Sequence, residues 1–183
     1  ASKKAAQQLL PGQFVVVIGA GGLGHIGIQV LKAMCGAEII AVDTNDVSLE
    51  LAKESGADHM VKADGNEVEK ILDLTSGGAE IVMDYVGEKG TTTKGLDMTR
   101  AMGSYFVIGY GENVDYPTVN LVVGEKSVVG NLVGTWADLN ELMSLAGRGL
   151  VNLATKEYSL ADANAALHDL AAGKVKGRAI LIP

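Results

Sequence analysis

The sequence predicts an α/β fold: a doubly wound parallel sheet of six strands, followed by a short C-terminal α/β strap. Short apolar segments rich in β-branched residues alternate with helical patterns, which is typical of a parallel sheet covered on both faces by crossover helices. A glycine-rich turn joins the first apolar segment to the first long helical pattern. Near the end, an alanine-rich helical segment, 161–172, precedes a last apolar run, GRAILIP, and together they predict either a seventh α/β excursion or a strap that belongs to another unit.

Six apolar segments are short enough for strands and are bounded by turn residues. The predicted strands are Phe14–Ile18, Glu38–Val42, His59–Val61, Ile81–Tyr85, Ser104–Ile108 and Ser127–Leu132. Helical patterns follow five of them, and the predicted helices are His25–Cys35, Val47–Ser55, Glu67–Leu74, Thr92–Met102 and Ala137–Ala146. This regular alternation indicates one continuous α/β domain without a repeat of solenoid period.

The first strand and helix flank the segment VVVIGAGGLG, residues 15–24, which contains the pattern G-x-G-x-x-G. In this context Gly19 permits a tight turn, Gly21 allows a pyrophosphate to approach the backbone, and Gly24 allows close packing of the helix. The helix N-terminus favours negative charge. The segment therefore predicts a Rossmann fold with a phosphate site, and a purely structural turn is the alternative.

Asp43 stands nineteen residues after Gly24, at the end of the second predicted strand. A carboxylate at this distance is placed to accept hydrogen bonds from the hydroxyls of an adenosine ribose. A 2′-phosphate would repel it by about 1 to 4 kcal/mol near a protein surface, and residues 44–46 supply no cation. We therefore expect NAD to be favoured over NADP.

Composition excludes several classes of protein. Fifteen Lys and Arg residues against twenty-two Asp and Glu residues give a formal net charge of −7, which disfavours a nucleic-acid partner. No apolar run approaches the roughly 18 residues that cross a bilayer, so we expect no membrane partner and a cytoplasmic location. The single cysteine, Cys35, excludes an internal disulfide and a paired-cysteine zinc site.

Other polar residues carry weaker signals. Tyr85 and Lys89 have the spacing of a catalytic Tyr–Lys pair, but Tyr85 ends a strand pattern and an intervening glycine interrupts any helix. The three histidines, His25, His59 and His168, are too scattered to suggest a metal triad. His25 opens the phosphate-binding helix, and we expect it to be a cap or an exposed residue.

Further residues are expected to have structural roles only. Cys35 lies at a core-like position near the end of its helix, and Met98 and Met102 fit core packing. The acidic segment 67–73 predicts a solvated helix face.

Five motifs, in this order and spacing, resemble the cofactor-binding half of a zinc-type medium-chain alcohol dehydrogenase. They are LPGQFVVVIGAGGLGHIGIQVLKAMCGAEIIAVD, DYVG at 84–87, GSYFVIGYG at 103–111, SVVGNLVGT at 127–135 and the terminal GRAILIP. The resemblance implies NAD-dependent oxidation of an alcohol and the strand order 3-2-1-4-5-6, with NAD across the carboxyl ends of the strands. It places Gly21, Gly22 and Leu23 at the pyrophosphate and Asp43 at the adenosine ribose.

The same resemblance places further residues around the cofactor. Arg178 matches an arginine that neutralises the pyrophosphate, and five residues match the nicotinamide side: Val86, Gly109, Tyr110, Leu132 and Val133. No residue of this chain is assigned a catalytic or metal-binding role. In the family the zinc ligands lie on a preceding catalytic domain, so we expect this chain alone to hold no zinc and to turn over no alcohol.

The resemblance also divides the chain. Residues 1–12 match the remnant of an interdomain helix, 13–157 the NAD-binding domain, and 158–183 a strap that in the family belongs to the catalytic domain. The expected partners are an alcohol or aldehyde, the zinc-binding catalytic domain and a second copy of the chain. The homo-oligomer is expected to form through DYPTVNL, 115–121, which has the extended, proline-marked character of an exposed edge.

Two classes of function follow. The first is the NAD-binding portion of an alcohol dehydrogenase, which positions the nicotinamide for hydride transfer. The alternative is a free-standing NAD-binding or sensing module without catalysis. The match through GRAILIP favours the first, because a self-contained sensor has no need of the strap.

Overall fold

The computed structural model describes residues 1–183 and contains the predicted six-stranded sheet. The strands run in the order β3-β2-β1-β4-β5-β6, as the resemblance implies, and every neighbouring pair is parallel. Their bounds are β1 (Phe14–Ile18), β2 (Glu38–Asp43), β3 (His59–Lys62), β4 (Ala79–Asp84), β5 (Thr99–Val107) and β6 (Ser127–Gly130). The predicted doubly wound fold is confirmed.

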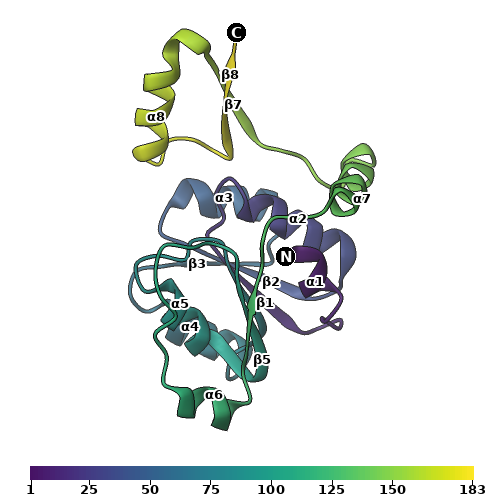
Figure 1. The fold of residues 1–183 in the computed structure, drawn as a ribbon, viewed down its shortest axis with the longest axis vertical. Coiled ribbons are helices and arrows are strands. Elements are labelled where there is room, and N and C mark those ends of the chain that lie inside the picture. The colour runs from purple at the N-terminus through teal and green to yellow at the C-terminus, as the bar shows by residue number, and fades with distance from the viewer.

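Helices cover both faces of the sheet (Figure 1). They are α1 (Ser2–Ala6), α2 (Gly24–Met34), α3 (Asp46–Glu54), α4 (Glu67–Thr75), α5 (Thr91–Met98), α6 (Thr118–Gly124) and α7 (Trp136–Gly147). Side chains alternate along β1: Val15 and Val17 pack in a cluster with α1, α2 and α3, whereas Val16 and Ile18 pack with α4 and α5. None of the helices is both long and apolar enough to span a bilayer.

Two predicted boundaries differ from the structure at α5 and β5. The helix expected over 92–102 ends at Met98, and β5 begins at Thr99 rather than at Ser104. Thr99 has extended backbone, and its hydroxyl donates to the carbonyl oxygen of Gly95, which closes the last turn of α5. Met102, which was expected in the core, is 71% exposed because it lies in an irregular part of β5 with a φ of 61°.

The segment 115–121 was expected to be an extended edge, and this prediction is wrong. Pro117 is the N-cap of α6, which runs from Thr118 to Gly124. The valines of α6 stand on a short surface helix. All three are largely exposed: Val119, Val122 and Val123, at 61%, 75% and 80%. The sheet has two edge strands, β3 and β6, and β6, which follows α6, pairs only with β5.

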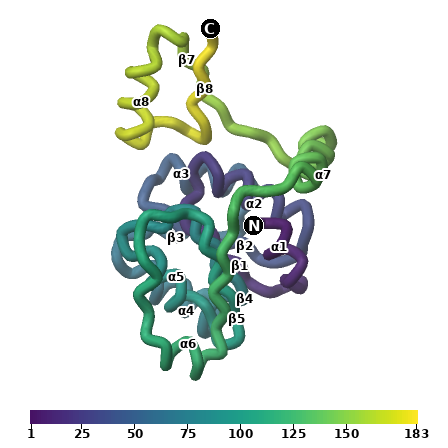
Figure 2. Tube along the Cα trace, in the orientation of Figure 1, coloured from purple at the N-terminus to yellow at the C-terminus, as the bar shows by residue number.

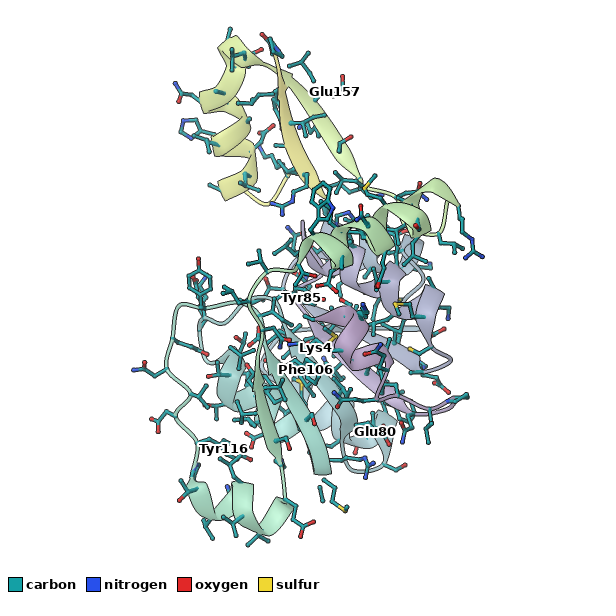
Figure 3. The ribbon with its side chains drawn as sticks, turned by 45° about the vertical axis from the view of Figure 1, so that its right-hand side comes forward. Lys4, Glu80, Tyr85, Phe106, Tyr116 and Glu157 are labelled. Carbon is teal, nitrogen blue, oxygen red and sulfur yellow. The ribbon has the colours of Figure 1, made fainter.

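A second, smaller unit follows α7. It contains β7 (Thr155–Ser159), a 3-10 turn, η1 (Leu160–Asp162), α8 (Ala163–Ala171) and β8 (Arg178–Ile182). The two strands form a separate parallel sheet. Figure 2 shows this unit, in yellow, beyond α2 and α3 and joined to α7 by a single stretch of chain. In Figure 3, Tyr85 and Phe106 lie in the large unit while Glu157 stands on the small one.

Candidate functional site

The glycine turn between β1 and α2 is built so tightly that side chains are excluded from two of its positions. A Cβ on Gly24 would lie 1.8 Å from the carbonyl oxygen of Gly19, so the helix could not approach the strand with any other residue there. Gly19 has a φ of +85°, and its Cβ would lie 2.6 Å from Val86. Gly21, in contrast, has open space where a Cβ would stand. The turn therefore combines a fixed backbone with an open outer side.

Three consecutive backbone amides of this turn have no partners inside the protein. Gly21, Gly22 and Leu23 donate no hydrogen bond in the structure, and Leu23, the N-cap of α2, makes no side-chain cap. Unpaired N–H groups at a helix N-terminus are a binding site for an anion, and the helix dipole favours the same charge. The geometry thus fits a phosphate group, as the sequence predicts.

Asp43 ends β2 beside this turn. Its Oδ2 accepts the backbone N–H of Ala20 at 2.9 Å, and its Oδ1 accepts that of Asn45 at 2.8 Å. Each carboxylate oxygen retains a lone pair after these bonds, so both can accept a further hydroxyl. Asp43 consequently anchors the glycine turn as well as offering acceptors for a ribose, a second role that the sequence did not reveal.

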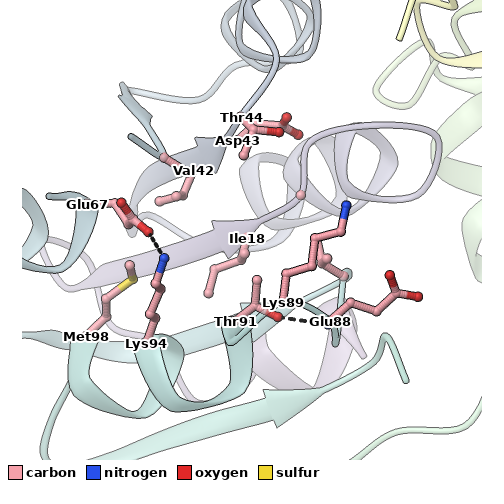
Figure 4. A pocket seen from close by; sticks show the side chains of 13 residues that line it. Ile18, Val42, Asp43, Thr44, Glu67, Glu88, Lys89, Thr91, Lys94 and Met98 are labelled. Carbon is pink, nitrogen blue, oxygen red and sulfur yellow. Dashed lines mark hydrogen bonds and ion pairs between the residues drawn. The ribbon is translucent and has the colours of Figure 1, made fainter. Parts of the chain in front are cut away.

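A cleft of about 200 Å³ opens beside Asp43 between the β1–β2 edge and the start of α5 (Figure 4). Its apolar residues come from both sides of the sheet edge and form a slot: Ile18, Val42, Ala63, Val86 and Met98. Four charged residues of the lining were not predicted at the site: Glu67, Glu88, Lys89 and Lys94. These residues follow the carboxyl ends of strands, where open α/β sheets bind their ligands. Their positions in the sequence would therefore have placed them at the same edge of the sheet.

Glu67, at the start of α4, was expected on a solvated helix face, and this expectation is wrong. Its side chain is only 3% exposed because Lys94 pairs with it at 2.6 Å and the N–H of Gly65 donates to it at 2.7 Å. Burial opposes ionisation, but the hydrogen bond from Lys94 and the backbone N–H groups outweigh it and hold the pKa of Glu67 below its ordinary value. The pair closes one end of the cleft (Figure 4).

A buried carboxylate shapes the neighbouring strand end. Asp84 is fully buried at the end of β4. Its Oδ1 accepts the N–H groups of Val86 at 2.7 Å and Gly87 at 2.9 Å, and its Oδ2 accepts the hydroxyl of Tyr105 at 2.7 Å. The turn at 86–87 packs on the next strand end so closely that a Cβ on Gly109 would lie 2.4 Å from Val86. Two residues predicted on the nicotinamide side, Val86 and Gly109, are thereby brought together.

The other three residues predicted on the nicotinamide side face outward. Tyr110, Leu132 and Val133 are 90%, 89% and 89% exposed. They follow β5 and β6 and do not line the cleft beside Asp43. They offer an apolar surface on the part of the sheet edge that lies away from that cleft.

Arg178 lies against the glycine turn, although 156 residues separate it from Gly22 in the sequence. A Cβ on Gly22 would lie 3.0 Å from both Cδ and Nε of Arg178. The guanidinium therefore stands beside the unpaired amides of the turn, and an arginine there can bind two oxygens of a phosphate. The strap is docked on the large unit, as this predicted role requires.

His25 was expected to be a cap or exposed, and this is wrong: the side chain is fully buried. Its Nδ1 lies 2.7 Å from the carbonyl oxygen of Gly21, and its Nε2 lies 3.3 Å from the backbone nitrogen of Ala154. Burial, reinforced by the charge of Arg178, lowers the pKa of His25 in spite of its bond to Gly21. No local sequence signal predicts this environment, because Ala154 is 129 residues away.

The remaining candidates take structural positions. The hydroxyl of Tyr85 lies 2.7 Å from Ser2 Oγ in α1, and burial raises the pKa of Tyr85 to about 12. Lys89 lies instead on the wall of the cleft, which agrees with excluding the two as a catalytic pair. Cys35 is half-buried against the core, and its thiol donates to the carbonyl oxygen of Leu31. No group of three or more His, Cys, Asp or Glu side chains is arranged to hold a metal ion.

The strand order, the glycine turn and the acidic residue at the end of β2 define the class: a Rossmann-type, dinucleotide-binding α/β domain. Comparison with known proteins gives the family. Residues 22–148 match the family of zinc-binding dehydrogenases, and the chain belongs to that family.

Individual relatives and solved structures are consistent with this family. The chain is 37% identical to the NAD-dependent alcohol dehydrogenase of Sulfurisphaera tokodaii over 94% of its own length. It superposes on the alcohol dehydrogenase of Aeropyrum pernix with a TM-score of 0.95 at 40% identity, over 100% of this chain and 53% of that one. An acetophenone reductase from Geotrichum candidum, in complex with NAD, gives a TM-score of 0.83 at 26% identity, over 100% of this chain and 51% of that one.

The match covers only part of each relative. The chain spans about half the length of the curated relatives it matches, 51% of the Sulfurisphaera tokodaii protein and 51% of a 38% identical relative from Sulfolobus acidocaldarius.

Proposed function

We propose that this chain binds NAD along the carboxyl edge of its sheet and presents the nicotinamide for hydride transfer between the cofactor and an alcohol or its carbonyl product. One observation carries the proposal: the unpaired amides of the glycine turn, the carboxylate of Asp43 and the guanidinium of Arg178 lie together at one edge. The relatives named NAD-dependent alcohol dehydrogenase support the choice of cofactor and reaction. When bound, NAD supplies the hydride acceptor.

We assign different residues to three parts of the cofactor. The N–H groups of Gly21, Gly22 and Leu23, with Arg178, bind the pyrophosphate, because all are unpaired donors at a helix N-terminus or beside it. Asp43 binds the adenosine ribose, and the slot beside it takes the adenine through apolar contact. The nicotinamide side is assigned to Val86, which also lines the slot, and to four residues at the other strand ends: Gly109, Tyr110, Leu132 and Val133.

We assign the catalytic zinc and most of the alcohol pocket to a further domain, because the relatives are about twice as long as this chain. In this proposal residues 1–12 belong to the helix between the domains, 13–157 form the NAD-binding domain, and 158–183 return to the catalytic domain. The second sheet supports the last division, although β7 already begins at Thr155. Zinc on that domain would polarise the alcohol oxygen, and this chain would hold the hydride acceptor within reach of it.

We further propose that the chain associates with a second copy of itself through the edge of the sheet that β6 forms. β6 has one unpaired edge, and α6 beside it exposes three valines. An unpaired edge strand next to apolar surface is suited to pairing across a two-fold axis. This assignment replaces the extended segment that the sequence suggested at 115–121.

Calorimetric titration of NAD and NADP tests the cofactor. NAD should bind at least about tenfold more tightly, because a 2′-phosphate would face the Asp43 carboxylate. Asp43→Gly should narrow this ratio, and Asp43→Asn should narrow it while keeping an acceptor for the Ala20 amide that anchors the turn.

Asp46→Asn is the matched control for this titration. Asp46 is a nearby exposed carboxylate that pairs with Lys62, outside the cleft, so its removal should leave the NAD-to-NADP ratio unchanged. Equal affinities for the two cofactors in the unsubstituted chain would contradict the assignment of Asp43. Such a result would point to Lys89, which lines the cleft and has no carboxylate partner, as a ligand for the 2′-phosphate.

A further inference from the structure

Two side chains of α2, those of Gln29 and His25, form hydrogen bonds with the backbone just before the second unit. Gln29 Nε2 donates to the carbonyl oxygen of Asn152 at 2.9 Å, and the N–H of Asn152 donates to Gln29 Oε1 at 2.7 Å. The carboxamide of Gln29 therefore pairs with the backbone of residue 152 as a neighbouring strand would. One turn earlier on the same face of α2, His25 reaches Ala154.

The tautomer of His25 follows from its partners. Nδ1 lies 2.7 Å from the carbonyl oxygen of Gly21, which can only accept, so Nδ1 carries the proton. Nε2 is then a free acceptor for the N–H of Ala154. The neutral ring thus connects the carbonyl of a residue in the phosphate-binding turn to the backbone of the segment that leads into β7.

From Ala154 the connection continues to Arg178. The N–H of Arg178 donates to the carbonyl oxygen of Ala154 at 2.9 Å. Gly177 packs so closely there that a Cβ on it would lie 2.2 Å from the same oxygen, and its φ of +79° suits glycine. The backbone of Arg178 is therefore fixed relative to Ala154, and its side chain lies across Gly22.

We propose that His25 and Gln29 are positioning residues that form a clamp on residues 152–154 and thereby hold Arg178 against the glycine turn. The clamp links anion binding at the turn to docking of the second unit. Because such coupling is reciprocal, a bound pyrophosphate stabilises the docked unit as much as docking strengthens binding. The inference rests on the proposed NAD site for the identity of the anion, but not for the clamp itself.

Two other contacts hold the second unit, and they define the competing explanation. Asn45 Nδ2 donates to the carbonyl oxygen of Gly173 at 2.9 Å, and Lys176 pairs with Glu54 at 2.6 Å. The ion pair is exposed, and pairs of that kind contribute little. If these contacts alone positioned Arg178, loss of the clamp would leave its contribution to binding unchanged.

Hydrogen exchange without any cofactor tests the clamp directly. His25→Asn keeps a donor close to the ring's Nδ1 but is too short to accept from Ala154, whereas His25→Gln places an acceptor where Nε2 stands. We expect faster exchange in peptides covering 150–158 for His25→Asn and for Gln29→Met, and protection close to that of the unsubstituted chain for His25→Gln. Gln8→Met, at an exposed glutamine on the chain before β1, is the matched control.

Unchanged exchange of 150–158 in both His25→Asn and Gln29→Met would overturn the clamp. Equal exchange in His25→Asn and His25→Gln would also overturn it. Such a result would indicate a general packing defect, because only His25→Gln keeps an acceptor for the N–H of Ala154.

A double-mutant cycle with NAD tests the coupling. Arg178→Ala should weaken NAD binding by at least about tenfold in the otherwise unsubstituted chain, which is the range for a hydrogen bond to a charged group. In the Gln29→Met background the same substitution should cost less than about threefold, because Arg178 is no longer held in place. Equal losses in the two backgrounds would overturn the coupling. Absence of NAD binding in every variant and in the unsubstituted chain would instead refute the proposed cofactor, and hydrogen exchange would still decide on the clamp.

Discussion

Residues 1–106 and residues 107–183 are stabilised in different ways. Forty-three residues of the chain are buried, and only three of them lie after Val107: Val151, Ala166 and Gly177. The first region, the core region, contains both apolar clusters that sandwich the sheet. The second, the outer region, consists of α6, β6, α7 and the small β7–β8 unit, and it exposes most of the large apolar side chains that the chain leaves in contact with water.

Two regions of one continuous fold can therefore be stabilised by different interactions. The core region gains its free energy from burial, at about 25 cal/mol per Å² of apolar surface. The outer region is held by a few directional contacts, such as those of Gln29 with Asn152 and Asn45 with Gly173. Its exposed leucines and valines are surface suited to other protein surfaces, which is what the proposed catalytic domain and second copy provide.

The largest expected effect compares a leucine of each region. Leu31, on α2, is fully buried, so Leu31→Ala should lower the free energy of unfolding by about 2 to 5 kcal/mol. Leu167, on α8, is 63% exposed, and Leu167→Ala should change the free energy of unfolding by less than about 0.5 kcal/mol. Urea denaturation followed by circular dichroism measures both. Similar losses would show that the outer region has a packed core of its own.

Two tyrosine–aspartate hydrogen bonds sharpen the comparison. Burial, and then the bond to Asp84, raise the pKa of Tyr105, so its hydroxyl stays protonated and donates. Tyr105→Phe leaves one oxygen of the buried Asp84 carboxylate without its donor and should cost about 1 to 3 kcal/mol. The hydroxyl of Tyr158 also donates to an aspartate, Asp169, at 2.9 Å, but Lys156 and water reach that carboxylate as well. Tyr158→Phe should cost less than about 1 kcal/mol in the same denaturation experiment, and the reverse order would contradict this account.

The exposed apolar surface of α6, in the outer region, is expected to take part in self-association. Val119→Lys on α6 should weaken self-association at least about tenfold, because a lysine would be desolvated in the interface. Light scattering across a concentration series measures it. Leu10→Lys, at a leucine that is 65% exposed near α1, is the control and should leave association unchanged. A monomer at tens of micromolar in every variant would refute the proposed dimer.

The smallest expected effect depends on pH. Because burial lowers the pKa of His25 from its ordinary value of 6.5, the unfolded chain binds a proton more readily than the folded one. The stability contributed by neutral His25 is therefore present above pH 6.5 and is lost as pH falls through the folded pKa. Unfolding free energies measured between pH 7 and pH 5 should decline more in the unsubstituted chain than in His25→Gln, with Arg178 the charged group beside the ring. Parallel declines would contradict a neutral, buried His25.

Much of the fold could be predicted from sequence because its signals are local. The alternation of strand and helix patterns predicted the parallel sheet, and strand ends were placed within a few residues for β1, β2 and β3. The order of the strands came from the resemblance to the dehydrogenase family. The failures have local causes too. α6 was missed because valines and Pro117 favour extended structure, and α5 was extended too far because the residues after Met98 keep a helical spacing.

The site was predictable where a motif carries it and hidden where distant segments meet. Gly21 and Asp43 follow from spacing alone. The burial of His25 could not be predicted, because the backbone it contacts comes from the far side of α7. The ion pair of Glu67 with Lys94 was hidden for the same reason: each residue belongs to a different helix, and an acidic run by itself suggests solvent exposure.

The long-range contact of His25 with Ala154 also predicts a folding order. Contacts across 129 residues close a long loop, and such contacts form late because the entropy of loop closure must be offset first. The glycine turn needs only β1, α2 and the neighbouring strands, so we expect its amides to be in place before Arg178 reaches them. The phosphate site would then form in two stages, and an anion bound early at the turn would favour the docking of β8.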